Sequence, residues 1–157
     1  MIHNFIYHNP TKVYFGNGEL SHLHEELSRF GHQVLLVYGG GSIKKNGLYD
    51  VIMKEIQLAG MAGYELSGIQ ANPEIDPVRQ GISLCRHGDV DVILAVGGGS
   101  VLDTAKAIAG SVFYEEDPWQ LIKSRAHISH ALPLITVPTM AATGSEMNSC
   151  AVITNPD

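Results

Sequence analysis

Two identical segments, Gly-Gly-Gly-Ser, constrain the fold most strongly, because each directly follows a short apolar run. The first occupies residues 39–42 after Val34–Tyr38, and the second occupies residues 97–100 after Val92–Val96. Such runs are typical of strands that are covered on both faces of a parallel sheet. Glycine allows sharp turns and close approach of a ligand to the backbone. We therefore expect both turns at the carboxyl ends of buried strands, where parallel α/β sheets bind ligands.

Helical patterns separate these apolar runs along the chain. Residues 51–59 have hydrophobic side chains at helical spacing, and a further helix is expected to begin with Asp76 as its N-cap and Pro77 next to it. Leu134–Val137 predicts a third buried strand. Strands that alternate with helices across short loops indicate right-handed βαβ units. The predicted fold class is therefore α/β, a doubly wound, Rossmann-like parallel sheet.

The first residues predict a small β-hairpin that precedes this sheet. Its strands are expected at His3–Tyr7 and Lys12–Phe15, joined at Asn9-Pro10, and a helical stripe from Leu20 to Phe30 follows. The chain has 157 residues and shows no internal linker or repeat. One dinucleotide-binding domain over residues 1–157, incomplete at its C-terminal edge, is the predicted organisation.

Composition and charge exclude several classes of function. The net charge of −6 argues against a nucleic-acid partner, and no apolar run approaches the length of a membrane span. The N-terminus does not have the pattern of a signal peptide. Cys85 and Cys150 form no CxxC motif, so a reducing cytoplasm is the expected compartment. The eight histidines show no metal-ligand spacing, and no G-x-S-x-G motif is present.

The glycine turns and a later loop are candidates for nucleotide contacts. Neither turn matches G-x-G-x-x-G or a Walker A motif, yet each offers backbone N–H groups to a pyrophosphate. Asp103 stands three residues after Ser100, which favours a capping-box pair and is compatible with a position beside the nicotinamide. The small, hydroxyl-rich loop from Thr139 to Glu146 suits an adenine or ribose, although an ordinary surface turn is the alternative.

With these motifs together, the chain resembles the iron-containing (group III, metal-dependent) alcohol dehydrogenases. The butanol dehydrogenase and NADPH-dependent aldehyde reductase branch is the most similar. The matching stretches lie in order along nearly the whole chain; they are residues 9–16, 38–45, 72–73, 97–106 and 138–146. The resemblance implies the fold of the N-terminal, dehydroquinate-synthase-like domain of these enzymes.

The resemblance also implies which residues bind the cofactor. They lie in the two glycine turns and in the segments after the other predicted strands: Gly39, Gly40, Gly41, Ser42, Asn72, Gly97, Gly98, Gly99, Ser100, Asp103, Thr139, Met140 and Thr143. Gly98 to Ser100 are expected at the pyrophosphate, and Asp103 near the nicotinamide. The sequence departs from a common family pattern at Met140 and Ala142, where relatives often read threonine and glycine.

The preference between NAD(H) and NADP(H) can be argued from charge. A site that selects NAD carries a carboxylate at the strand end that meets the ribose 2′-OH. Here that position is Gly39, with Lys44 and Lys45 close behind. Because two ammonium groups favour a phosphate dianion, the sequence predicts NADP(H) over NAD(H).

The family resemblance implies a reversible reaction between a primary alcohol and an aldehyde, with hydride passing to or from the nicotinamide. Its metal, Fe²⁺ or Zn²⁺, is held by a helical domain whose ligands are not in this sequence, so no catalytic or metal-binding residue is assigned. We expect this chain alone to be catalytically inactive and the whole protein to be a homodimer. The alternatives are a glycerol dehydrogenase or dehydroquinate synthase relative and a stand-alone nucleotide-binding module.

Overall fold

Four parallel strands form the centre of the computed structural model, which describes residues 4–6, 8–124 and 127–156. The strands are β1 (Gln33–Gly39), β2 (Ala62–Ile69), β3 (Val92–Gly97) and β4 (Leu134–Pro138). Their order in the sheet is β2-β1-β3-β4, and every neighbouring pair is parallel. The chain therefore adds β2 on one side of β1, and then β3 and β4 on the other side. This doubly wound topology confirms the predicted fold class.

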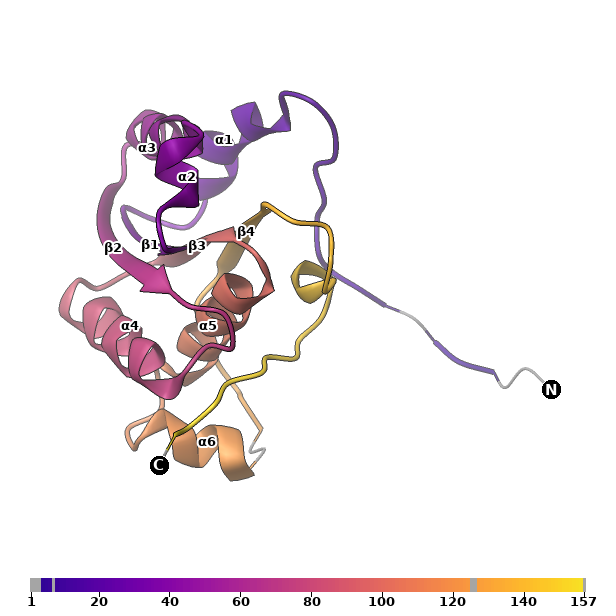
Figure 1. Cartoon of the computed structure of the whole chain (residues 1–157), viewed down its shortest axis with the longest axis vertical. Helices are drawn as coiled ribbons and strands as arrows, with labels where there is room; N and C mark the ends of the chain where they lie inside the picture. Colours follow the sequence, from indigo (N-terminus) through magenta and orange to yellow (C-terminus); the bar gives the residue numbers. More distant parts are fainter. Residues whose placement is uncertain (1–3, 7, 125–126, 157) are drawn as a thin grey trace.

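Helices cover both faces of the sheet (Figure 1). On one face lie α1 (Leu23–Leu27), α2 (Ser42–Lys45) and α3 (Leu48–Leu58), with the short helix η1 (Glu19–His22) before α1. On the other face lie α4 (Ile75–His87), α5 (Gly99–Ser111) and α6 (Pro118–Ser124). A second short helix, η2 (Ser145–Met147), follows β4. No helix in the described part of the chain is long and apolar enough to cross a membrane.

Alternating side chains of the central strands create two separate cores. Val34 and Leu36 of β1 pack with Ile52 of α3 on one face. Leu35 and Val37 point the other way and join the core under α4 and α5. Because β1 and β3 are covered on both faces, nearly all their residues are buried, as the apolar runs predicted. β4 is only partly buried, since it lies at one of the two edges of the sheet.

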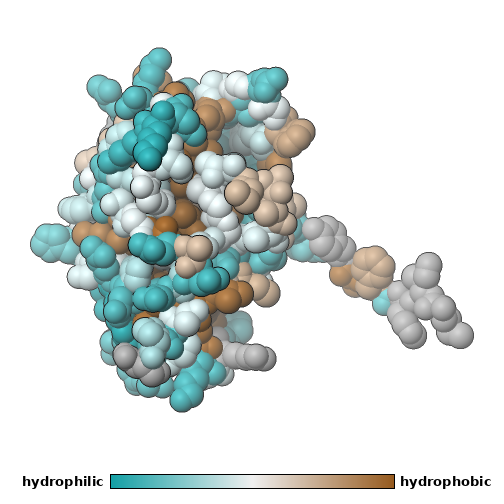
Figure 2. All heavy atoms as spheres, in the orientation of Figure 1, coloured by the Kyte–Doolittle hydropathy of each residue, from teal (hydrophilic) through white to brown (hydrophobic). Residues whose placement is uncertain are grey.

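The predicted N-terminal hairpin is wrong in the part of the chain that the structure describes. Residues 4–6 and 8–15 contain no strand, while His3 and Tyr7 lie outside the described residues. A two-stranded hairpin without a third strand or a helix to pack against is marginal in water. Residues 4–6 instead project from the body, where Figure 2 shows hydrophobic side chains, while Asn9, Lys12 and Tyr14 form hydrogen bonds to it. Phe5 and Ile6 are 80% and 98% exposed.

The helix α4 begins two residues before the predicted start. Its N-cap is Glu74, so the prediction of Asp76 as N-cap is wrong, and Asp76 pairs instead with Arg79 at 2.7 Å. The reason is a contact that is distant in sequence. The Ile75 N–H donates to the Thr154 carbonyl at 3.0 Å, which satisfies a helix-terminal donor that a local cap would otherwise serve.

Candidate functional site

Both glycine turns lie at the carboxyl edge of the sheet, on either side of the point where the strand order reverses. Tyr38 and Val96 are register partners, so Gly39 and Gly97 end neighbouring strands. Gly97 in turn pairs with Pro138, which places Thr139 at the same edge. Asn72 follows β2 on this side, in a left-handed conformation with φ of 55°. In doubly wound sheets this reversal point is where ligands bind.

The three glycines of the second turn serve different purposes. A Cβ at Gly97 would lie 2.6 Å from Val101 Cγ2, and one at Gly99 would lie 2.8 Å from Thr143 Oγ1. A Cβ at Gly98 would meet no atom within 4 Å, and the φ of Gly98, −85°, is open to any residue. The fold itself therefore needs small residues at 97 and 99, whereas the space before Gly98 is left open.

Gly98 is also the N-cap of α5, and its cap uses no side-chain hydrogen bond. The helix has 13 residues and therefore a substantial dipole. Its first N–H groups and the positive end of this dipole lie at Gly98, next to the open space. This geometry suits an anion such as a pyrophosphate. The predicted capping-box pair of Ser100 with Asp103 is wrong, because Ser100 already lies inside the helix.

Asp103 binds the segment that follows β4. Its Oδ1 accepts a hydrogen bond from Ser145 Oγ at 2.5 Å, and its Oδ2 accepts one from the Val152 N–H at 3.0 Å. The side chain is 17% exposed. Both carboxylate oxygens therefore hold the segment of residues 145–152 against α5.

Lys106 is a residue of this site to which the sequence assigned no role. Its ammonium donates to carbonyl oxygens of Ser145 at 3.0 Å, Asn148 at 3.4 Å and Cys150, and to Asn148 Oδ1 at 3.2 Å. It also lies 3.4 Å from Asp103 Oδ1. Its spacing of three residues from Asp103 on a helix was the only available signal. The two side chains together fix the path of the chain across α5.

The predicted threonine contacts belong to the loop that connects β4 to this segment. The Thr139 N–H donates to the Gly97 carbonyl at 3.0 Å, so the loop begins beside the second glycine turn. Thr143 packs against Gly99, and its Oγ1 accepts a hydrogen bond from the Ser145 N–H at 3.3 Å. Met140, between them, is 68% exposed. The fold thus brings the loop to the start of α5.

The first glycine turn has a different form. Gly41 is the N-cap of α2 with φ of 104°, a conformation that favours glycine, and a Cβ at Gly40 would meet no atom within 4 Å. Ser42 is exposed, and α2 ends after four residues. A single turn has little dipole, so α2 offers less support to an anion than α5 does.

One lysine behind the first turn places its ammonium group over two aromatic rings. The ammonium of Lys44 lies 4.4 Å from the ring centre of Tyr49 and 5.2 Å from that of Tyr38. Both tyrosine hydroxyls donate to Glu65 at 2.7 Å. The charge expected from Lys44 at the turn is therefore partly offset by a carboxylate from β2, which the sequence argument did not include.

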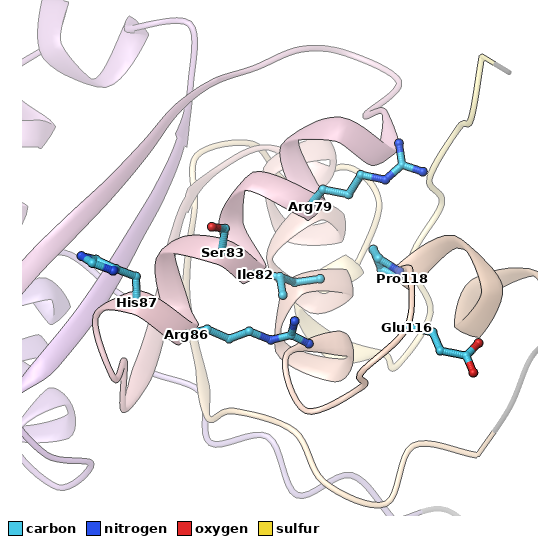
Figure 3. A pocket seen from close by; sticks show the side chains of 7 residues that line it. All are labelled: Arg79, Ile82, Ser83, Arg86, His87, Glu116 and Pro118. Carbon is cyan, nitrogen blue, oxygen red and sulfur yellow. The ribbon is translucent and has the colours of Figure 1, made fainter.

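Two surface hollows lie away from the glycine turns. One, of about 490 Å³, is lined by residues of α4 and of the connection from α5 to α6 (Figure 3). Its arginines bond within the fold, Arg79 to Asp117 and Arg86 to the carbonyl of Val112. The other, of about 700 Å³, runs between α3 and β2. Neither hollow includes a residue of the two glycine turns, so the candidate site is identified from backbone geometry.

Metal-ligating side chains do not gather in the described residues. No three histidine, cysteine, aspartate or glutamate side chains among them are placed to hold a metal ion.

The fold and the position of its turns define a Rossmann-like parallel α/β domain. The family model described as "Iron-containing alcohol dehydrogenase" matches residues 10–157. The chain belongs to this family, which confirms the resemblance drawn from its motifs.

Individual relatives agree with this assignment. The chain is 53% identical over 152 residues to "Probable NADH-dependent butanol dehydrogenase 2" of Bacillus subtilis and 41% identical over 155 residues to "NADPH-dependent aldehyde reductase YqhD" of Escherichia coli. Each alignment covers 97% of this chain and 39% of the relative. The crystal structure of NADH-dependent butanol dehydrogenase A from Thermotoga maritima superposes with a TM-score of 0.93 at 44% identity, over 97% of this chain and 38% of that one. The chain thus spans about two fifths of the length of these relatives.

Proposed function

We propose that the carboxyl edge of the sheet binds the pyrophosphate of a nicotinamide dinucleotide at Gly97–Ser100 and the start of α5. The observation that carries the proposal is Gly98, a glycine that the fold does not require and that faces open space at a helix N-terminus. A backbone without a side chain lets phosphate oxygens reach the N–H groups of the helix. Gly40 is open in the same way at the neighbouring turn.

The other predicted residues take places around this pyrophosphate site. Thr139, Met140 and Thr143 lie on the loop beside the second turn and are proposed to line the adenine and ribose side. Asn72, at the end of β2, is proposed to contact the cofactor. Asp103 is proposed near the nicotinamide, and because Ser145 and Val152 bind both its oxygens, its role there is to position the loop.

The whole protein is proposed to be an oxidoreductase that transfers hydride between a primary alcohol or aldehyde and the nicotinamide. The support is the family, together with relatives whose names are butanol dehydrogenase and aldehyde reductase. In this scheme the described residues bind and orient the cofactor. The family name points to iron in the whole protein, and Fe²⁺ or Zn²⁺ supplied from outside the described residues is part of the proposal.

We further propose that NADP(H) is preferred over NAD(H). The support is that β1 ends in Gly39 without a carboxylate and that Lys45 is exposed just behind the turn. Among the relatives, the butanol dehydrogenases of Bacillus subtilis are named for NADH and the reductase of Escherichia coli for NADPH.

A homodimer in a reducing, cytoplasmic compartment completes the proposal. The support for self-association is the exposed apolar side chains of the N-terminal segment; Phe5, Ile6 and Phe15 are each at least 80% exposed. Such surface favours a partner. The support for the compartment is that Cys85 and Cys150 are both free thiols.

Gly98→Ala tests the binding site separately from the fold. The new methyl group meets no atom of the protein, so the free energy of unfolding should change by less than about 1 kcal/mol, whereas the dissociation constant for NADP⁺ and NAD⁺ should rise at least about tenfold. Gly97→Ala is the matched control, because its Cβ collides with Val101 and it should lower stability. Unchanged nucleotide affinity in a stable Gly98→Ala variant would refute the proposed site.

A further inference from the structure

A four-residue cluster of Lys44, Tyr38, Tyr49 and Glu65 lies behind the first glycine turn. It joins α2, the end of β1, the first turn of α3 and the edge strand β2. Glu65 Oε2 accepts the hydroxyl of Tyr38 and Oε1 accepts that of Tyr49, both at 2.7 Å. The two rings are tilted by 59° with centroids 5.8 Å apart, and the Lys44 ammonium lies over both. One carboxylate thus orients both rings that hold the lysine.

The cluster contains one positive and one negative charge. Burial opposes ionisation of Glu65, but the hydrogen bonds from Tyr38 and Tyr49 outweigh it and hold the pKa of this carboxyl below its ordinary value. The contact with Tyr38 raises the pKa of Lys44, which therefore stays protonated. Since both groups are charged near neutral pH, the cluster presents much less positive charge to the turn than Lys44 would alone.

We propose that Glu65 is a specificity-determining residue for the dinucleotide: acting through Tyr38 and Tyr49, it holds Lys44 on the two rings and lowers the attraction of the Gly39–Ser42 turn for a ribose 2′-phosphate. The inference rests on the proposed function. It assigns a carboxylate to the ribose end of the site, where the strand end itself has none. Lys45, outside the cluster and exposed, then carries the main attraction for the phosphate.

The effect is electrostatic, so its size and salt dependence follow from charge separation. Removing one unit charge from the neighbourhood of a dianion in a solvated site changes the interaction energy by roughly 1 to 2 kcal/mol. This corresponds to about a five- to thirtyfold change in affinity at low salt. Salt screens solvated charges over about 8–10 Å at physiological ionic strength, so the change should shrink as salt is added.

The experiment compares the dissociation constants of 2′,5′-ADP and 5′-AMP, which differ by the 2′-phosphate, in the unmutated chain and in Glu65→Gln. Glutamine has nearly the same shape and removes the charge; its oxygen accepts from one tyrosine hydroxyl, and its NH2 group donates to the other. Glu115→Gln is the matched control, because it changes the net charge equally at an exposed residue beyond α5. Lys44→Met provides a second variant with the opposite sign.

Glu65→Gln should raise the preference for 2′,5′-ADP over 5′-AMP at least about fivefold at low salt, and Lys44→Met should lower it. The gain should disappear in high salt and be absent from Glu115→Gln. If both nucleotides bind but Glu65→Gln leaves their ratio unchanged, or Glu115→Gln changes it equally, the role of Glu65 is refuted and the proposed site stands. If the unmutated chain binds neither nucleotide, both proposals fail.

Discussion

The hydroxyl of Ser145 donates a hydrogen bond to Asp103 Oδ1 across 2.5 Å, joining the segment after β4 to helix α5 over 42 residues of sequence. Ser145 is 5% exposed, so the bond is formed away from water. Asp103 belongs to the motif that opens α5, and Ser145 belongs to the loop that follows the last strand. Two motifs of the candidate site are therefore one structural unit.

Ser145→Ala should loosen the loop without disturbing the sheet. A buried hydrogen bond to a charged group contributes about 1.5 to 3 kcal/mol, so the amides of residues 143–152 should exchange with solvent roughly ten- to a hundredfold faster. Hydrogen exchange followed by mass spectrometry measures this locally. Ser149→Ala, at an exposed position, is the control, and equal exchange in both variants would contradict the bond.

Gly99→Ala should lower stability through its contact with Thr143. The added Cβ would lie 2.8 and 2.9 Å from the Oγ1 and Cγ2 atoms of Thr143, and overpacking of this kind costs about 1 to 3 kcal/mol. Thr143→Ala removes both atoms, so the double variant should recover most of the loss. Urea unfolding of the four proteins gives the coupling energy, and strictly additive effects would show that the two residues do not touch.

The two cysteines should differ sharply in reactivity. Cys85 is 2% exposed, and burial raises the pKa of its thiol to about 12, whereas Cys150 is exposed. Because the thiolate is the reactive form, iodoacetamide should label Cys150 within minutes and Cys85 only on unfolding. Peptide mapping after timed labelling distinguishes the sites. Rapid labelling of Cys85 in native conditions would place that helix face in solvent.

Acid should weaken the attachment of the N-terminal segment. Hydrogen bonds from Lys12 at 2.6 Å and Tyr14 at 2.5 Å lower the pKa of Glu26. Since the folded-state pKa lies below the unfolded one, this stabilisation is complete above the ordinary glutamate pKa of about 4.3 and is lost as the pH falls through the folded value. The difference in Tm between the unmutated chain and Glu26→Gln should therefore vanish at acid pH. A Tm difference that persists at acid pH would mean that the charge of Glu26 does not cause it.

The local pattern of apolar residues along the chain predicted most of the sheet correctly. The apolar runs Val34–Tyr38 and Val92–Val96 became β1 and β3 within a residue of their expected ends, because strands covered on both faces need no information from elsewhere. The N-terminal hairpin failed for the opposite reason. Its strand propensity is local, but strand formation needs a partner that the described chain does not supply.

The candidate site was predictable in its position and not in its contacts. Glycine turns after buried strands must lie at the carboxyl edge, so the sequence predicts that Gly39 and Gly97 share this edge, as they do. The partners of Asp103 and Lys44 were not expected, because Ser145 and the two tyrosine rings come from other elements. Spacing along a helix predicted that Asp103 pairs with Ser100 as a capping box. In the structure its carboxylate instead accepts a charge-assisted hydrogen bond from Ser145.

The sequence by itself determined the alternation of strands and helices, the places of the turns and the family, because burial and turn formation depend on neighbouring residues. Only the tertiary structure decided which glycines the fold needs and which it leaves open. It also decided that a carboxylate from β2 offsets the lysine behind the first turn. The physical reason is that sterics and charge act through space, over distances that the order of residues does not record.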